Sequence, residues 1–287
     1  MNSRLGLLGG VILAAALLWW ALGSGSIEAS DVKRKLSDYT LDREPFGVPL
    51  PPRWRAELEQ AIATAPEVSL LDPAAPAMAS EVLRSVSWVD PQSVAVHLDM
   101  PRGLQVEFLP RPARFLLVVN SRPAGVLAAD GTMLPEGLPP TFKGSLIQVQ
   151  LESGELIPPP GKRIASPVAL EALRAWPELF QMQEITNLAI KRIQRKAAYA
   201  NAVRSVTPPL TLVLTDGREI EWGRSEASRD PNTPDLATKM ARLGAVMRQY
   251  PRLAGVQVVA LDHPDEAFVL DANYLQLPFD SRLLLTK

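Results

Sequence analysis

Histidine and cysteine, two residue types that often carry catalysis, are scarce in this chain. It has 2 histidines and no cysteine among 287 residues, so it can form no disulfide and no cysteine-based metal site. His97 falls on the outward phase of an expected strand, and His263 falls in an expected turn. A zinc site needs three or four converging ligands, and these two histidines have no ligand spacing to each other. We therefore predict no metal and no cofactor.

Asp130 and Asp216 are the carboxylates with the most suggestive setting, because each precedes a glycine. Two carboxylates can act as general acid and base. Asp-Gly is also the usual dipeptide of a tight hairpin turn, which explains both positions without catalysis. The sequence contains no nucleophile elbow, P-loop or dinucleotide fingerprint. We therefore expect no enzymatic activity and no small-molecule substrate.

A basic cluster lies within an expected helix at about 185–204 and consists of Lys191, Arg192, Arg195 and Lys196. A solvated helix face explains it, and the alternative is contact with an acidic partner or lipid headgroups. The whole chain carries 30 basic and 31 acidic residues, so the cluster does not reflect a basic protein. Because phosphate binding needs a concentrated basic surface, nucleic acid is not an expected ligand.

An uncharged apolar run lies near the N-terminus, from Leu5 to Leu22. Its 18 residues would form a helix about 27 Å long, close to the hydrocarbon thickness of a bilayer. We predict a transmembrane helix over residues 5–22, after a cytoplasmic tail of residues 1–4. A cleaved signal peptide is the alternative, because a positive residue precedes the run and small residues follow it. Residues 23–52 mix small, charged and proline residues and are typical of a linker.

Two helical patterns and two alternating runs follow the linker. The helical patterns cover Trp54–Ala63 and Ala77–Leu83, with apolar residues on one face of each. The alternating runs, Ser93–Leu98 and Leu104–Phe108, flank a proline-glycine turn and predict a β-hairpin. A hairpin that covers two short helices forms a small α+β unit, which we place at residues 53–113.

Strand-like runs separated by turns dominate residues 114–274. The clearest predicts a hairpin over Thr211–Gly223, with its turn at Asp216-Gly217. We expect helices at Val168–Arg174, at about 185–204 and at Asp235–Gln249, the last after a Thr-Pro start signal. This predicts a mostly antiparallel β-domain with a few helices, followed by a loosely held tail over residues 275–287. Three tryptophans are expected in the core: Trp88, Trp176 and Trp222.

Three stretches in this order resemble a known family. Arg84–Ala113 combines Trp-Val, a Pro-x-Gly turn and Arg111-Pro112, which stands where the family has a closing Arg-x-Pro, although Ser87 stands where a proline is usual. Gly125–Pro135 is similar to the start of the family's β-domain. The third stretch comprises Leu212–Gly223 and Ala237–Leu270, which are similar to the hairpin, helix and terminal strand pair of the family's β-domain. The order resembles the cell-division family FtsQ/DivIB, in which a POTRA module precedes a β-domain. The first POTRA strand is not evident near Pro45–Leu50.

The resemblance implies an α+β fold class: an N-terminal transmembrane helix, a small POTRA-like domain at residues 53–113, and a mostly antiparallel β-domain at residues 114–274. It implies a non-enzymatic divisome scaffold in the inner membrane at the division septum, with its domains in the periplasm. The expected partners are coiled-coil proteins similar to FtsB and FtsL, and the scaffold would regulate septal cell-wall synthesis.

By position in the family, a partner would bind at the last strand. The expected contact residues are Ala267, Phe268, Val269, Leu270 and Tyr274. An exposed strand edge offers unpaired N–H and C=O groups to a partner strand. The alternative for Phe268 and Leu270 is that they face the core, because alternate residues of any strand do so.

Two other functions compete with this one. A membrane-anchored POTRA protein acting in secretion or envelope assembly would normally have several modules or a β-barrel of lipid-facing strands. An anchored hydrolase would need a convergent nucleophile or metal constellation, which the sequence does not indicate.

Overall fold

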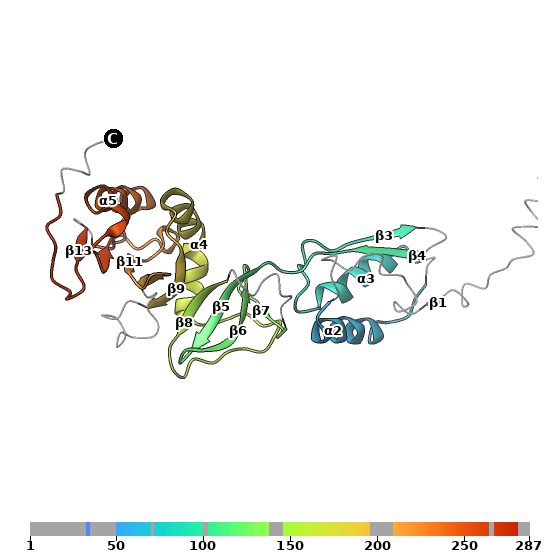
Figure 1. Cartoon of the computed structure of the whole chain (residues 1–287). Helices are drawn as coiled ribbons and strands as arrows, with labels where there is room; N and C mark the ends of the chain where they lie inside the picture. The colour runs from blue at the N-terminus through green and yellow to red at the C-terminus, as the bar shows by residue number, and fades with distance from the viewer. Residues whose placement is uncertain are drawn as a thin grey trace, which may run out of the picture. The chain divides into compact units, whose positions relative to one another are not determined.

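The computed structural model describes residues 33–34, 50–69, 72–99, 103–137, 146–195, 209–263 and 267–280 (Figure 1). The chain forms two compact units. Apart from residues 33–34, the described part of the first unit is residues 56–69, 72–86, 91–99 and 103–109. The second unit contains residues 50–55, Ser87–Asp90 and the chain from Pro110 onward.

The first unit contains two helices and a hairpin, as its residue patterns predict. Its elements are β1 (Lys33–Arg34), most of α2 (Pro52–Ala63), β2 (Val68–Ser69), α3 (Ala75–Arg84), β3 (Ala95–Asp99) and β4 (Gly103–Glu107). Strand β1 pairs with β2, and β3 with β4, both antiparallel. Helix α3 buries Ala75, Ala79 and Leu83, which are spaced four residues apart on one face.

A nine-stranded sheet forms the second unit. Its strands are β5 (Ala113–Val119), β6 (Arg122–Ala128), β7 (Met133–Leu134), β8 (Ile147–Leu151), β9 (Ile190–Arg195), β10 (Leu210–Leu214), β11 (Glu219–Gly223), β12 (Val258–Ala260) and β13 (Phe268–Leu270). Their order in the sheet is β13-β12-β11-β10-β9-β8-β5-β6-β7. The hairpin β10–β11 turns at Asp216-Gly217 as predicted, and Gly217 has φ 89°, which favours glycine.

Two α-helices pack with this sheet, α4 (Pro167–Thr186) and α5 (Leu236–Gln249) (Figure 1). Two short 3₁₀-helices, η4 (Glu226–Ser228) and η5 (Pro251–Leu253), flank α5 in the sequence. Helix α4 contacts β8, β9 and β10. The core between helices and sheet includes Leu117, Val149, Ala172, Leu179, Ile193, Leu212, Trp222 and Val246.

Antiparallel pairs form the majority in the sheet, as predicted, with five of the eight pairs between its described strands, but the other three pairs are parallel and make the sheet mixed. Strand β5 runs parallel to β8, β8 to β9, and β11 to β12. Parallel neighbours need a long crossover, usually through a helix. Helix α4 connects β8 to β9, and α5 lies between β11 and β12. The sequence predicts helices in both connections. Only the folded structure shows that each helix leads to a strand parallel to the one before it and paired with it.

The prediction of a helix at about 185–204 is also wrong. Helix α4 ends at Thr186, and Asn187 follows in the left-handed conformation with φ 56°. Residues 190–195 form β9 between β8 and β10. Pairing with two neighbouring strands therefore overrides the helical pattern of this segment. Helix α4 is in turn longer than the expected Val168–Arg174 and continues through Pro177.

The prediction of an N-terminal transmembrane helix is corrected, and with it the inner-membrane location. None of the helices within the described residues is long and apolar enough to cross a membrane. Residues 5–22, on which the prediction rested, lie outside the described part of the chain. We withdraw both expectations.

Candidate partner-binding edge

Strand β13 lies at one end of the nine-stranded sheet and pairs on its inner side with β12 alone. The pairing is antiparallel and places Val269 opposite Val259. One edge of β13 therefore faces away from the sheet. An outer edge is where a sheet can accept a further strand.

The side chains at this edge alternate between two faces of the sheet. Ala267 and Val269 are buried, with 3% and 0% of their surface exposed. Phe268 and Leu270 are half-buried on the opposite face. The alternative raised for Phe268 and Leu270, that they face the core, is therefore wrong, since Ala267 and Val269 take that position.

A tight turn follows β13 and brings Tyr274 to the surface. The Asp271 carboxylate accepts the N–H of Asn273 at 2.8 Å and of Leu275 at 2.9 Å. The Asp271 N–H donates to the Leu275 carbonyl at 3.0 Å. Tyr274 adopts φ 58°, which is uncommon outside glycine, and both Tyr274 and Leu275 are 64% exposed. The turn thus presents two neighbouring apolar side chains to solvent.

Helix α5 holds the connection that leads into β13. The buried Arg242 guanidinium donates to the carbonyls of Leu261 at 3.0 Å and of His263. The His263 ring meets the Phe268 ring edge to face, 4.9 Å between centroids. The end of β12 and the start of β13 are therefore tied to the same helix.

The start of α5 is fixed by its N-cap. The Asp235 carboxylate accepts the Thr238 N–H at 2.7 Å. Hydrogen bonds from Thr238 lower the pKa of Asp235. Asp235→Ala is expected to lower the free energy of unfolding by about 1 kcal/mol. Because the folded pKa is depressed, this stabilisation is present above the ordinary aspartate pKa and lost as pH falls through the folded value.

Urea unfolding at several pH values checks this prediction. The difference between the original chain and the Asp235→Ala variant should shrink on acidification. Asp235→Asn, which keeps a capping oxygen, should lose less stability, and its difference from Asp235→Ala should not change with pH, because neither variant has the carboxylate. A constant difference at all pH values would contradict the capping role.

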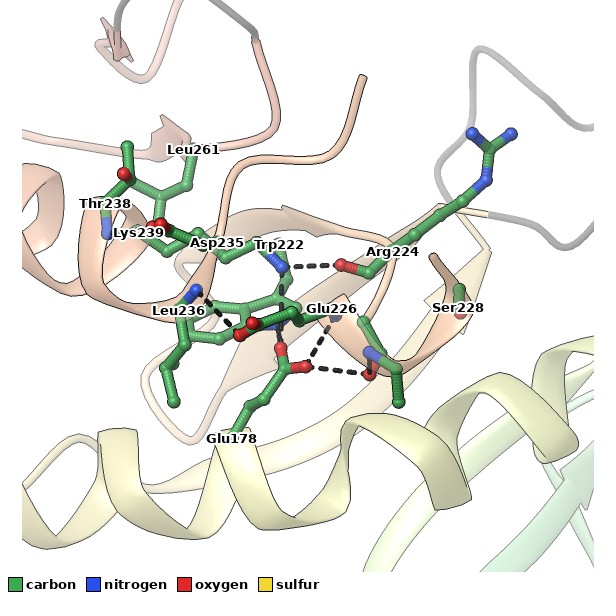
Figure 2. Close-up of polar contacts among 12 residues, drawn as sticks. Glu178, Trp222, Arg224, Glu226, Ser228, Asp235, Leu236, Thr238, Lys239 and Leu261 are labelled. Atoms are coloured by element: carbon green, nitrogen blue, oxygen red, sulfur yellow. Dashed lines mark hydrogen bonds and ion pairs between the residues drawn. The ribbon is translucent and has the colours of Figure 1, made fainter. Parts of the chain in front are cut away.

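A buried polar network joins α4 to β11, η4 and α5 (Figure 2). One oxygen of the Glu178 carboxylate accepts from the Trp222 indole N–H at 2.9 Å and from Lys239 Nζ at 3.4 Å. The other accepts from the Ser225 hydroxyl and the Glu226 N–H, both at 2.7 Å. Lys239 Nζ also donates to the Arg224 carbonyl at 2.5 Å.

A second buried carboxylate, Glu171, lies one heptad earlier on α4. It accepts from the Ser225 N–H at 2.6 Å and from the Ser228 hydroxyl at 2.7 Å. Arg174 contributes an ion pair at 3.3 Å. The two glutamates thus bind the η4 turn to α4 through its backbone and its serines.

The network contains an acid, a base and a serine, but its burial makes it structural. Glu171 and Lys239 have 0% of their surface exposed. Burial lowers the pKa of Lys239, while the nearby Glu178 carboxylate opposes that shift. A substrate cannot reach groups that have no exposed surface. We therefore assign the network to holding α5, and through it the β13 edge.

The other candidate residues have ordinary structural roles. Asp130 forms an ion pair with Arg111, and Asp216 forms one with Arg218, whose hydrogen bond lowers the pKa of Asp216. His97 is exposed on β3. Among the described residues, no group of three or more histidine, aspartate or glutamate side chains could hold a metal ion.

The basic cluster lies on a strand instead of a helix. Lys191 is exposed, and Arg192 is half-buried. Arg195 pairs with Glu152 at 2.8 Å. Lys196 lies outside the described residues. Side chains alternate between the two faces of a strand, so the described cations of this cluster do not all share one face, as they would on a helix.

A pocket of about 520 Å³ lies beside β6, where it is lined mainly by apolar groups. Its lining includes Leu116, Pro123, Val126, Leu134 and Glu136. Glu136, the one carboxylate of this lining, pairs with Arg53. The pocket lining therefore presents no acid-base pair to a substrate.

Sequence reasoning missed the buried ionic network. A signal was present: Glu171 and Glu178 fall in phase with Val168, Ala175 and Met182, all of which α4 buries. A charged residue on the apolar face of a helix indicates a buried polar contact. The identity of its partners, such as Lys239, follows only from the folded chain.

Comparison with protein-family models finds no match to this chain, and comparison with curated proteins finds no similar sequence.

Proposed function

We propose that this chain is a non-enzymatic scaffold of cell division that binds a partner protein at the β13 edge. The observation that carries the proposal is the position of β13 at the end of the nine-stranded sheet. The resemblance of the sequence to the FtsQ/DivIB family supports the same edge as the partner site. On this proposal the partners are coiled-coil proteins similar to FtsB and FtsL.

Strand addition supplies the binding mechanism. A partner strand pairs with outward backbone groups of β13, and side-chain pockets select the partner. Tyr274 and Leu275 supply exposed apolar surface beside the strand. Aromatic side chains at the centre of an interface often contribute most of its binding energy. Tyr274 is therefore the expected anchor.

Burial and pairing of the polar groups support a role without catalysis. The carboxylates and the lysine that lie close together, Glu171, Glu178 and Lys239, are enclosed between α4, η4 and α5. Asp130 and Asp216 are engaged at hairpin turns by arginines. These arrangements stabilise the fold and leave no accessible acid-base pair among them.

Photo-crosslinking in cells tests the proposal. A photoreactive amino acid replaces Tyr274, and the captured protein is identified by mass spectrometry. Leu156 provides the matched control, because it is 90% exposed in the same unit but lies outside the edge. Capture of a small coiled-coil division protein from position 274 and not from 156 supports the proposal. Capture of secretion or envelope-assembly components, or of nothing by a folded protein, overturns it.

Replacement of the expected anchor gives a second test. Tyr274→Ala is expected to weaken binding of the captured partner by about tenfold or more, since an interface anchor contributes about 2 kcal/mol or more. Titration calorimetry with the purified partner measures this change. Leu156→Ala should leave the affinity unchanged. Equal affinities for the original and Tyr274→Ala chains would remove Tyr274 from the interface.

A further inference from the structure

The outer edge of β13 is partly occupied by the chain itself. Residues 275–280, which we call the C-terminal segment, turn back along β13 so that Gln276 bridges Leu270 in antiparallel register. The Leu277 N–H donates to the Val269 carbonyl at 2.8 Å. Because a partner strand would need the same carbonyl, the segment and a partner cannot both pair at this position.

The end of α5 holds the far part of the segment. The Pro278 carbonyl accepts from Gln249 Nε2 at 2.7 Å and from the Tyr250 hydroxyl. The Asp280 N–H donates to Gln249 Oε1 at 3.0 Å. Side chains at the C-terminal end of α5 thus hold the C-terminal segment beside β13.

The segment is a short and imperfect strand. Leu277 and Phe279 alternate along it and are partly buried against the core. Its described backbone bonds to β13 and the turn after it are two: the Leu277 N–H donates to the Val269 carbonyl, and the Leu275 carbonyl accepts the Asp271 N–H. A longer partner strand would offer β13 more backbone hydrogen bonds than this segment does.

We infer that the C-terminal segment is a displaceable occupant of the β13 edge. The inference rests on the proposed function for the site, and it adds the chemistry of the partner. The partner segment is an extended strand, antiparallel to β13, with apolar side chains at alternate positions corresponding to Leu277 and Phe279. A partner strand can bind only those molecules in which the C-terminal segment has left the edge. The apparent affinity for the partner strand is therefore the intrinsic affinity multiplied by the fraction of molecules with an open edge.

A peptide of residues 274–287, labelled with fluorescein, serves as the probe of the edge. Fluorescence anisotropy measures its binding to the full-length chain and to a full-length Leu277→Pro variant, which loses the N–H that reaches Val269. The peptide is expected to bind the variant about tenfold or more tightly than the original chain. Gln276→Ala, which changes only an exposed side chain, is the matched control and should behave like the original.

A peptide with N-methylated Leu277 is the control on the probe side. It lacks the donor to Val269 and should bind neither chain. Equal binding of the unmodified peptide to the original and Leu277→Pro chains, or no binding to a folded Leu277→Pro chain, overturns the inference.

Hydrogen exchange of the unsubstituted chain gives a readout that does not depend on folding of the variant. The Leu277 amide should exchange much faster than the Leu261 amide, which donates to Glu221 inside the sheet at 2.9 Å. Equal protection of the two amides would show a fixed segment and overturn displacement. If the peptide binds Leu277→Pro while position 274 captures no partner in cells, the proposed function fails and the displaceable segment stands.

Discussion

Lys239→Met is expected to lower the free energy of unfolding of the second unit by about 3–5 kcal/mol, because it leaves a buried carboxylate without its cation. Lys239 has no exposed surface and lies 3.4 Å from Glu178. It also lies 4.9 Å above the Trp222 ring. Urea unfolding followed by circular dichroism measures the loss.

A double-mutant cycle separates the ion pair from general packing. Glu178→Gln combined with Lys239→Met should cost less than the sum of the two single variants, with a coupling of about 1–3 kcal/mol. Lys191→Met, at an exposed position of β9, is the matched control and should stay within about 0.5 kcal/mol of the original chain. Additive single losses would mean that Lys239 and Glu178 do not interact.

The pH dependence of stability gives an independent check on Lys239. Burial lowers its pKa from 10.5, so the unfolded chain binds more protons than the folded chain between the two pKa values. The free energy of unfolding attributable to this lysine should therefore rise with pH through that window. The Lys239→Met variant should lack this rise. The same slope in both chains would contradict a depressed pKa.

Trp88→Ala is expected to lower the free energy of unfolding of the second unit by about 3–5 kcal/mol, as for other buried aromatic side chains. Trp88 is 0% exposed and stacks on Trp54 with 5.0 Å between ring centroids. Its indole N–H donates to the Trp54 carbonyl at 3.1 Å. The change removes the ring contacts and the hydrogen bond from the indole to that carbonyl.

Two substitutions calibrate this result in the same urea assay. Trp88→Phe keeps an aromatic ring but loses the indole N–H, so it should cost less than Trp88→Ala. Leu156→Ala, at a 90% exposed position, should have almost no effect. A loss below about 1 kcal/mol for Trp88→Ala would mean that the tryptophan pair does not support the unit.

Local chemistry could be predicted from the sequence, because the residues that determine it are neighbours in the chain. Asp216-Gly217 forms the β10–β11 turn, and Asp235 caps α5 after a proline. The β3–β4 hairpin follows from two alternating runs and the Pro-x-Gly pattern between them in the sequence. Of the three tryptophans expected in the core, Trp88 and Trp222 are fully buried, while Trp176 is half-buried. The turn, the cap and the hairpin each depend on a few adjacent residues, whereas the burial of the tryptophans follows from their large apolar side chains.

Long-range pairing was decided only by the tertiary structure. Residues 190–195 have a helical pattern but become β9 because β8 and β10 supply partners on both sides. The burial of Glu171 and Glu178 is tolerated because Ser225, Ser228 and Lys239, distant in the sequence, meet them. The sequence by itself determined turns, caps and apolar faces. The fold decided which strands pair, which charges are buried and what lies against β13, because those energies depend on groups that meet only after folding.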